Sequence, residues 1–227
     1  MHHAFSFPEH IRRALRNHIE KAVSEIDMNR YFQEPTYTTA LATKLAGVVY
    51  EQDDGYIKIE STVVNAQGRG AAEKWSGADL AITASVSKGN QGIRKAIMVQ
   101  SKLERIEKLS PSRKTELMHQ VQKMKQLTNS VKVMEIPVEN GQRRPRIVSG
   151  QKILAGQHYK SYDLSDYFVM RILTTFDGDT RQRFVDAVQE SKLTQLRLIA
   201  KLGLKQSVTN YVKPKESKVP VLVKVLG

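Results

Sequence analysis

Two apolar segments joined by a short turn place the strongest constraint on the fold of this chain. Residues 78–86 read ADLAITASV, residues 95–103 read KAIMVQSKL, and the KGNQG between them (88–92) has the composition of a hairpin turn. Apolar runs of this kind are typical of strands that are buried on both faces of a sheet. We therefore expect a buried antiparallel pair of strands.

The segments on either side of this pair predict helices packed against the same sheet. Pro8 is well placed to open a helix with apolar residues at helical spacing, and a second helix is expected to begin near Pro35. Ser110 and Pro111 predict the start of a third helix. Strands are expected at residues 56–64 and 131–138. This order predicts an α/β fold in which helices cover a mixed central β-sheet.

Downstream of these elements the pattern favours helices. Residues 164–174 and 180–202 are both expected to be helical, and the tail at 218–227 (KVPVLVKVLG) is expected to add a strand. The 227 residues fit one large domain. We expect three parts: a basic N-terminal helix (1–30), a core (31–140), and a C-terminal helical extension (141–227) packed on that core.

Composition restricts the partners and the compartment. The chain has 36 Lys and Arg against 23 Asp and Glu, a net charge of +13, which favours a polyanionic partner such as nucleic acid or an acidic membrane surface. Cysteine is absent, which excludes disulfides, thiolate zinc sites and a cysteine nucleophile and favours the reducing cytoplasm. The N-terminus contains no long apolar stretch, so we expect neither a secretory signal nor a membrane span.

Polar residues interrupt the two apolar segments at one place. Asp79 lies at the start of the first segment, and Gln100 and Lys102 lie near the end of the second. Residues two apart in a strand point to the same face, so Gln100 and Lys102 project together, and the hairpin can bring Asp79 beside them. Burying an acid, an amide and an ammonium costs free energy unless they pair or bind an ion. The cluster therefore indicates either a functional site or, on this pattern alone, an edge strand whose polar residues are solvated.

Metal-assisted phosphodiester cleavage would explain these residue types. Mg²⁺ prefers oxygen ligands and keeps several waters, so one carboxylate and a few neutral oxygens suffice, and Mn²⁺ is the expected substitute. Asp79 would be the central ligand, with the side-chain oxygen of Gln100 and the backbone carbonyl of Ser101 as further ligands. Lys102 would hold the attacking water or stabilise the negative charge that develops on the phosphate.

Asp79, a hairpin turn and the Gln-x-Lys of Gln100 and Lys102 resemble the PD-(D/E)xK nuclease superfamily, and in particular its QxK branch of Mrr-like restriction endonucleases. That family carries a glutamate on a helix before the first strand, and Glu34 in QEPTYTTALATKL is the match here. The lead-in RGAAEKWSGADLAI and the later HQVQKM also resemble bacterial QxK nucleases of defence systems. The resemblance covers residues 34–138.

The resemblance implies a restriction-endonuclease-like core and a metal-dependent endonuclease that cleaves DNA in anti-phage or restriction-type defence, with RNA open as a substrate. It also implies control by a regulatory partner or a homo-oligomer, because an unregulated nuclease would damage its own cell. The implied catalytic residues are Glu34, Asp79, Gln100 and Lys102, of which Glu34 would join the metal ligands.

Two departures from the family pattern affect what is expected. The residue before Asp79 is Ala78 instead of proline, and the neutral Gln100 removes one negative charge from the metal site. The second departure leaves open a nucleic-acid-binding protein that keeps the nuclease scaffold without turnover. Glu60 and Glu73 compete with Glu34 for the additional acidic role, although each also reads as a solvated residue, and Gln120 is a possible support for the site.

Basic residues at two places are candidates for contacting nucleic acid. The glycine-rich loop near residue 70 contains an aromatic residue between or beside basic ones, an arrangement that suits stacking on bases and contact with phosphates. A single tryptophan is more often a packing anchor than a stacking residue, and the first helix could instead contact an anionic membrane or an acidic protein. The candidates are Arg69, Lys74 and Trp75 in the loop and Arg12, Arg13 and Arg16 on the first helix.

Overall fold

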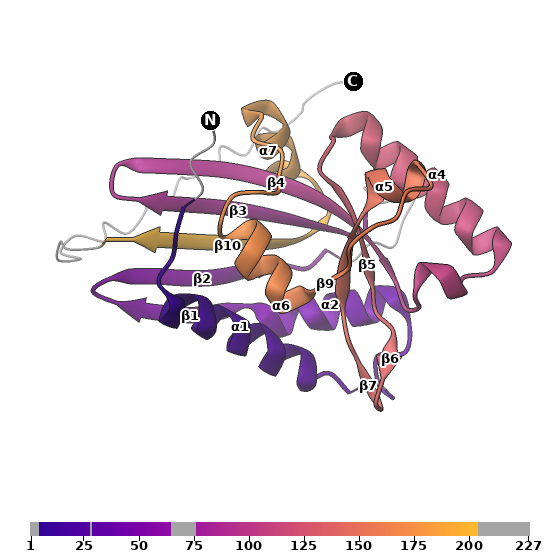
Figure 1. Cartoon of the computed structure of the whole chain (residues 1–227), viewed down its shortest axis with the longest axis horizontal. Coiled ribbons are helices and arrows are strands. Elements are labelled where there is room, and N and C mark those ends of the chain that lie inside the picture. The colour runs from indigo at the N-terminus through magenta and orange to yellow at the C-terminus, as the bar shows by residue number, and fades with distance from the viewer. Residues whose placement is uncertain (1–4, 28, 65–75, 204–227) are drawn as a thin grey trace, which may run out of the picture.

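One large sheet organises the molecule (Figure 1). The computed structural model describes residues 5–27, 29–64 and 76–203, and in these residues an eight-stranded sheet has the order β1-β2-β10-β3-β4-β5-β8-β9. A separate two-stranded hairpin contains β6 (Val138–Glu139) and β7 (Gln142–Arg143). The strands of the large sheet are β1 (Gly47–Gln52), β2 (Gly55–Thr62), β3 (Leu80–Lys88), β4 (Gln91–Lys102), β5 (Val131–Glu135), β8 (Arg146–Ser149), β9 (Tyr162–Asp163) and β10 (Thr194–Leu202).

The expected buried hairpin is formed by β3 and β4. The two strands pair antiparallel from Leu80 opposite Val99 to Lys88 opposite Gln91. β4 also pairs with β5 in parallel, and β3 pairs in parallel with β10, so the sheet is mixed. The predicted α/β class with a mixed central sheet is confirmed.

Helices cover both faces of this sheet (Figure 1). α1 (Glu9–Ser24), α2 (Glu34–Leu45) and α6 (Leu164–Tyr167) pack on one face, where their apolar side chains join Ile82, Val99 and Leu198 in one core. α4 (Pro111–Leu127), α5 (Gly150–Leu154) and α7 (Gln182–Glu190) pack on the other face, with Ala81 and Met98 in a second core. A 3₁₀ turn, η1 (Ile106–Lys108), precedes α4, and a π-helical turn, η2 (Phe168–Ile172), follows α6.

The sequence-based boundaries agree for the first three helices. Pro8 stands immediately before α1, and Ser110 caps α4 by accepting a hydrogen bond from the Arg113 amide, as expected of a residue that satisfies a free N–H group. The second helix ends at Leu45, and Val48 and Val49 belong to β1.

The prediction that residues 180–202 are helical is wrong for its second half. Only Gln182–Glu190 is helical, and residues 194–202 form β10, which lies between β2 and β3. Its burial alternates along the strand, with Leu196, Leu198 and Ala200 buried and the residues between them more exposed. A period of two is the signature of a strand and not of a helix.

The predicted division into three parts is corrected by the same finding. Residues 141–227 are not a helical extension, because β8, β9 and β10 all belong to the large sheet, and β10 joins its two halves. The core therefore extends well beyond residues 31–140. The first helix is present as expected, but its apolar face is buried in the same core. The expected strand at 218–227 lies outside the described residues.

Within the described part of the chain, none of the helices has both the length and the apolar character that crossing a membrane would require.

Candidate functional site

Asp79 lies where the chain enters β3, directly opposite the end of β4. Its backbone amide donates to the carbonyl of Val99 at 3.0 Å, which extends the β3–β4 ladder by one residue. The Asp79 side chain accepts two hydrogen bonds on Oδ2, from the Gln100 amide nitrogen at 2.6 Å and from the Ser101 backbone amide at 2.8 Å. These two hydrogen bonds fix the Asp79 carboxylate against the end of β4.

A tight backbone approach holds the segment before Asp79. Gly77 has a φ of +76°, and a Cβ placed there would lie 2.4 Å from the backbone oxygen of Gln120 in α4. Only glycine combines this backbone conformation with so close a neighbour. α4 and the start of β3 are consequently locked together beside the carboxylate.

Gln100 is almost fully buried, with 1% of its surface exposed. Its amide nitrogen also lies 3.3 Å from the carbonyl oxygen of Ser101, so the nitrogen faces two oxygen atoms. Its Oε1 is buried and makes no hydrogen bond to any described residue. A buried acceptor without a partner costs about 1–3 kcal/mol, so this oxygen is a position where a ligand would be favourable.

Lys102 reaches a different carboxylate. The lysine is 4% exposed, and its Nζ lies 3.1 Å from Oε1 of Glu34, the first residue of α2. The second oxygen of Glu34 accepts from the Leu103 amide at 3.3 Å and from the Arg113 guanidinium at 3.2 Å. Glu34 therefore bridges the end of β4 and the start of α4, and it pairs with two cations.

The four predicted catalytic residues thus meet as two neighbouring pairs. Asp79 contacts Gln100, and Glu34 contacts Lys102, with Ser101 between the two positions on β4. Ser101 is fully buried, and its hydroxyl accepts a hydrogen bond from Thr38 of α2 at 3.1 Å, which ties this helix to the strand. Glu34 contacts Lys102, Leu103 and Arg113. These contacts place Glu34 beside the lysine and not among the metal ligands expected around Asp79.

The oxygen types near Asp79 suit a hard divalent cation once the Gln100 amide group is turned, because its nitrogen and not its oxygen now faces Asp79 and the Ser101 carbonyl. A carboxylate, the unpartnered Gln100 Oε1 and the Ser101 carbonyl are the kinds of oxygen that Mg²⁺ or Mn²⁺ binds. Among the described residues, no group of three or more His, Cys, Asp and Glu side chains is arranged to hold a metal. A cation here would therefore depend on neutral oxygens as well as on Asp79.

The structure places one of the possible accessory residues, Glu60, away from the site and another, Gln120, near it. Glu60 lies in β2, opposite Arg197 of β10, and its carboxylate pairs with Lys58 at 2.9 Å. Because β10 separates β2 from β3, the structure does not bring Glu60 to Asp79, and the accessory role expected for it is wrong. Gln120 does lie nearby through its backbone contact with Gly77, and its Oε1 is buried without a hydrogen bond to a described residue.

The predicted nucleic-acid contacts are only partly described. Glu73, Arg69, Lys74 and Trp75 lie outside the described residues. On α1, Arg12 pairs with Glu9 at 2.6 Å, Arg16 pairs with Asp166 at 2.9 Å, and Arg13 is exposed. Two of the three arginines of this helix are therefore engaged within the protein.

Sequence reasoning missed Arg113 and Glu135. Arg113, in the first turn of α4, contacts both Glu34 and Glu104. Glu135 ends β5 in register with Lys102, is 3% exposed and accepts a hydrogen bond from the Ile106 amide at 2.8 Å, and burial raises the pKa of its carboxyl. The sequence signal for Glu135 is an acid inside the apolar run VKVMEIPV. Because neighbouring parallel strands end at the same edge of a sheet, this acid could be expected near the end of the strand that carries Lys102.

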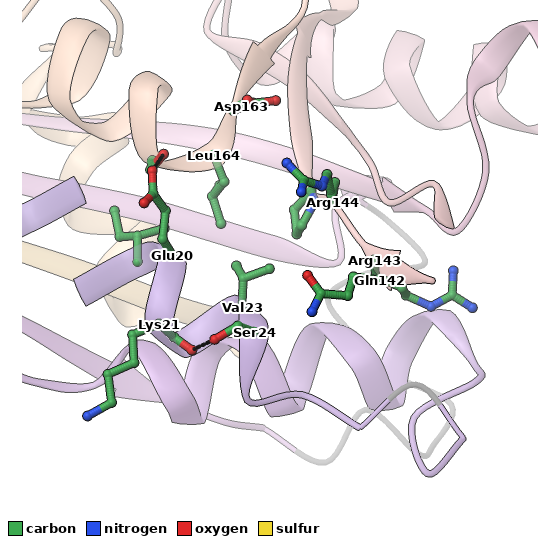
Figure 2. A pocket seen from close by; sticks show the side chains of 12 residues that line it. Glu20, Lys21, Val23, Ser24, Gln142, Arg143, Arg144, Asp163 and Leu164 are labelled. Atoms are coloured by element: carbon green, nitrogen blue, oxygen red, sulfur yellow. Dashed lines mark hydrogen bonds between the residues drawn. The ribbon is translucent and has the colours of Figure 1, made fainter. Parts of the chain in front are cut away.

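A cavity of about 420 Å³ lies elsewhere, between α1, the β7–β8 segment and α6. Figure 2 shows Glu20, Val23, Arg144 and Leu164 around it. None of the predicted catalytic residues lines this cavity, so the candidate site is the end of the β3–β4 hairpin and not this hollow.

Comparison of the chain with protein-family models, with curated proteins and with solved structures found no match.

Proposed function

We propose that this protein is a metal-dependent endonuclease that hydrolyses phosphodiester bonds in DNA. The observation that carries the proposal is the contact between Asp79 and Gln100 at 2.6 Å, with the buried Lys102 two residues further along the same strand. This is the acid, amide and ammonium combination that the PD-(D/E)xK resemblance requires, and the net charge of +13 suits a polyanionic substrate.

Asp79, Gln100 Oε1 and the Ser101 carbonyl would hold Mg²⁺ or Mn²⁺ after the Gln100 amide turns its oxygen toward Asp79. When bound, such an ion supplies charge stabilisation for the phosphate and lowers the pKa of water. Lys102 is fixed by Glu34, and Glu34 is in turn held by Arg113. The ammonium group can donate a hydrogen bond to the attacking water or to a phosphate oxygen as negative charge develops there. Fixing this donor in advance is what makes it effective in the transition state.

We also propose a setting of restriction-type or anti-phage defence inside the cytoplasm. The absence of cysteine suits a reducing compartment, and the defence role comes from the family resemblance. DNA cleavage without control would damage the host cell, so we propose that a protein partner or a homo-oligomer regulates the activity.

Plasmid cleavage tests the proposal directly. We expect the purified chain to nick supercoiled DNA with Mg²⁺ or Mn²⁺ and to lose activity in EDTA. Asp79→Asn and Lys102→Met should each abolish nicking, whereas Glu60→Gln, which changes an acid away from the site, should leave it unchanged. Parallel reactions on RNA identify the preferred nucleic acid. Nicking that survives both site substitutions would remove the proposed site.

A nucleic-acid-binding protein without turnover is the second candidate. It is favoured by one feature, the neutral Gln100 whose amide nitrogen, a hydrogen-bond donor, faces Asp79. Salt-dependent DNA binding without cleavage under any divalent ion, unchanged by Lys102→Met, would support this candidate over the nuclease.

A further inference from the structure

Another cavity opens at the β9 edge of the sheet, and it shares no residue with the pairs Asp79–Gln100 and Glu34–Lys102. Its volume is about 340 Å³, and its walls come from β5, β8, α5, the segment around β9 and the loop after η2. We call it the edge pocket and define it by six of its lining residues. These are Lys132, Lys152, Lys160, Tyr167, Arg171 and Phe176.

The lining of the edge pocket is strongly cationic. Its charged residues are three lysines and Arg171 against a single acid, Asp177. Burial alone would raise the pKa of the Asp177 carboxyl, but hydrogen bonds from Arg171 and Lys132 keep its pKa below the usual value. Asp177 therefore stays ionised and is held by Lys132 at 3.0 Å and Arg171 at 3.1 Å. Lys152 and Lys160 add positive charge that this carboxylate does not neutralise, so the pocket favours an anion.

A buried tyrosine forms part of the wall of the same pocket. Tyr167 is 1% exposed, its phenolic oxygen is buried, and the Asp177 carboxylate lies near it. Burial raises the pKa of this phenol well above its usual value, so the group remains protonated. The phenol therefore adds no negative charge to the cationic lining.

An exposed aromatic ring lines the pocket beside these cations. Phe176 is 65% exposed, and the Arg171 guanidinium carbon lies 5.5 Å from the centre of its ring and 5.8 Å from that of Tyr162. Lys160 Nζ lies 4.8 Å from the Tyr162 ring centre. An exposed ring among cations is the kind of surface on which nucleic-acid bases stack.

The loop that presents Phe176 is built in a strained and anchored form. Thr175 has a φ of +65°, a conformation that a β-branched residue rarely adopts. Gly178 has a φ of +124°, and a Cβ there would lie 2.7 Å from the side chain of the buried Lys95. Lys95 also donates to the carbonyl of Arg171 at 3.3 Å. Strain of this kind persists where the surroundings fix the backbone, so the ring position is a built feature.

We propose that the edge pocket binds a nucleoside phosphate. The phosphate lies against Lys152 and Lys160, and the base stacks on Phe176. The volume of about 340 Å³ suits one nucleotide unit. The chemistry is the same for a free nucleotide and for one nucleotide of a strand, and the experiment below separates these sources. The proposal does not rest on the nuclease activity.

Calorimetry of the full chain in EDTA, where metal-dependent cleavage cannot contribute, tests the pocket with AMP, adenosine and inorganic phosphate. We expect AMP to bind about tenfold more tightly than phosphate, because stacking adds to charge–charge attraction. Lys152→Ala/Lys160→Ala should weaken AMP binding at least about tenfold. The matched control is Lys108→Ala/Lys125→Ala, which removes the same charge from exposed positions outside the pocket. Circular dichroism and thermal unfolding verify that each variant is folded.

Two further variants separate the parts of the ligand. Phe176→Ala should weaken AMP about fivefold and leave phosphate binding unchanged, whereas Lys160→Ala alone should weaken both. A 5′-phosphorylated oligonucleotide that binds more tightly than AMP through the same residues would identify a strand as the source. No AMP binding at millimolar concentration, or equal loss in both double-lysine variants, overturns the proposal. If phosphate binds as tightly as AMP and Phe176→Ala leaves the affinity for AMP unchanged, the ligand is not a nucleotide and this assignment is overturned.

Discussion

The amide nitrogen of Gln100 lies 2.6 Å from the carboxylate of Asp79, and this contact joins the two strands that carry the candidate site. A hydrogen bond from a neutral amide keeps the carboxylate satisfied without adding a second negative charge. The glutamine thus lowers the electrostatic cost of assembling the site before a cation arrives.

Gln100→Glu should destabilise the metal-free protein at neutral pH. The introduced carboxylate replaces a donor with a like charge next to Asp79, and we expect a loss of roughly 1–3 kcal/mol in the free energy of unfolding. Mg²⁺ should raise the melting temperature of this variant more than that of the original chain. Gln91→Glu, at an exposed position of β4, is the control. A variant as stable as the original without metal would contradict the repulsion argument.

The ion pair between Lys102 and Glu34 predicts an asymmetry between two substitutions. Glu34 is the only acid that pairs with Lys102 among the described residues, whereas Glu34 also pairs with Arg113. Glu34→Gln leaves a buried ammonium without its counter-charge and should cost about 1–3 kcal/mol, reduced from the full buried-pair value by the partial exposure of Glu34. Lys102→Met, which removes the buried charge, should cost less. Urea unfolding of both variants and of the double variant gives the order, and the reverse order would refute this reading.

Lys95 predicts a rise in stability with pH. Burial lowers its pKa to about 7, with Arg171 acting in the same direction and Asp177 opposing it. The unfolded chain, where the lysine pKa is near 10.5, therefore holds more protons than the folded chain above pH 7. The free energy of unfolding should increase by up to about 1.4 kcal/mol per pH unit between pH 7 and 9 from this group. Urea unfolding across that range measures the slope.

Lys95→Met should reduce the dependence of the free energy of unfolding on pH. It should not displace the loop that contains Phe176, because the methionine side chain still fills the space beside Gly178. Lys125→Met, at an exposed position of α4, should retain the original slope. If the slopes of the two variants do not differ, Lys95 is not the titrating group.

Gly77 and Gly89 offer a matched pair for the close contact with α4. Both have positive φ, but a Cβ at Gly77 would meet the Gln120 backbone at 2.4 Å, whereas nothing lies within 4 Å at Gly89. Gly89→Ala should cost about 1 kcal/mol from backbone strain alone, and Gly77→Ala should cost at least about 2 kcal/mol more because α4 must move. Thermal unfolding of both variants tests the difference. Equal losses of stability in the two variants would mean that α4 moves away from residue 77 at little cost in free energy.

Much of the site could be predicted from local pattern. The spacing of Gln100 and Lys102 and the hairpin turn before them are short-range signals, and the observed contact of Gln100 with Asp79 follows from the pairing of adjacent strands. By contrast, the contact of Glu34 with Lys102 joins residues 68 positions apart, across the packing of α2 against the sheet. No spacing in the sequence encodes that approach, so the pairing of the glutamate with the lysine emerged only from the structure.

The error at residues 194–202 has a different cause. Their apolar residues follow a helix, and a short run rich in leucine fits a helical stripe as readily as a strand. What decides between them is pairing with β2 and β3, whose partners lie more than a hundred residues earlier in the chain. Long-range pairing of this kind overrides local propensity.

The place of β10 in the sheet has a consequence for how the protein is made. Its neighbours β2 and β3 leave the ribosome early, yet neither can complete its hydrogen bonding on that side until residues 194–202 emerge. A nascent chain stopped before Thr194 would present two open, apolar strand edges, which are the usual starting points of aggregation. Synthesis of this molecule therefore has a long vulnerable interval that ends only when one late segment inserts between two early ones.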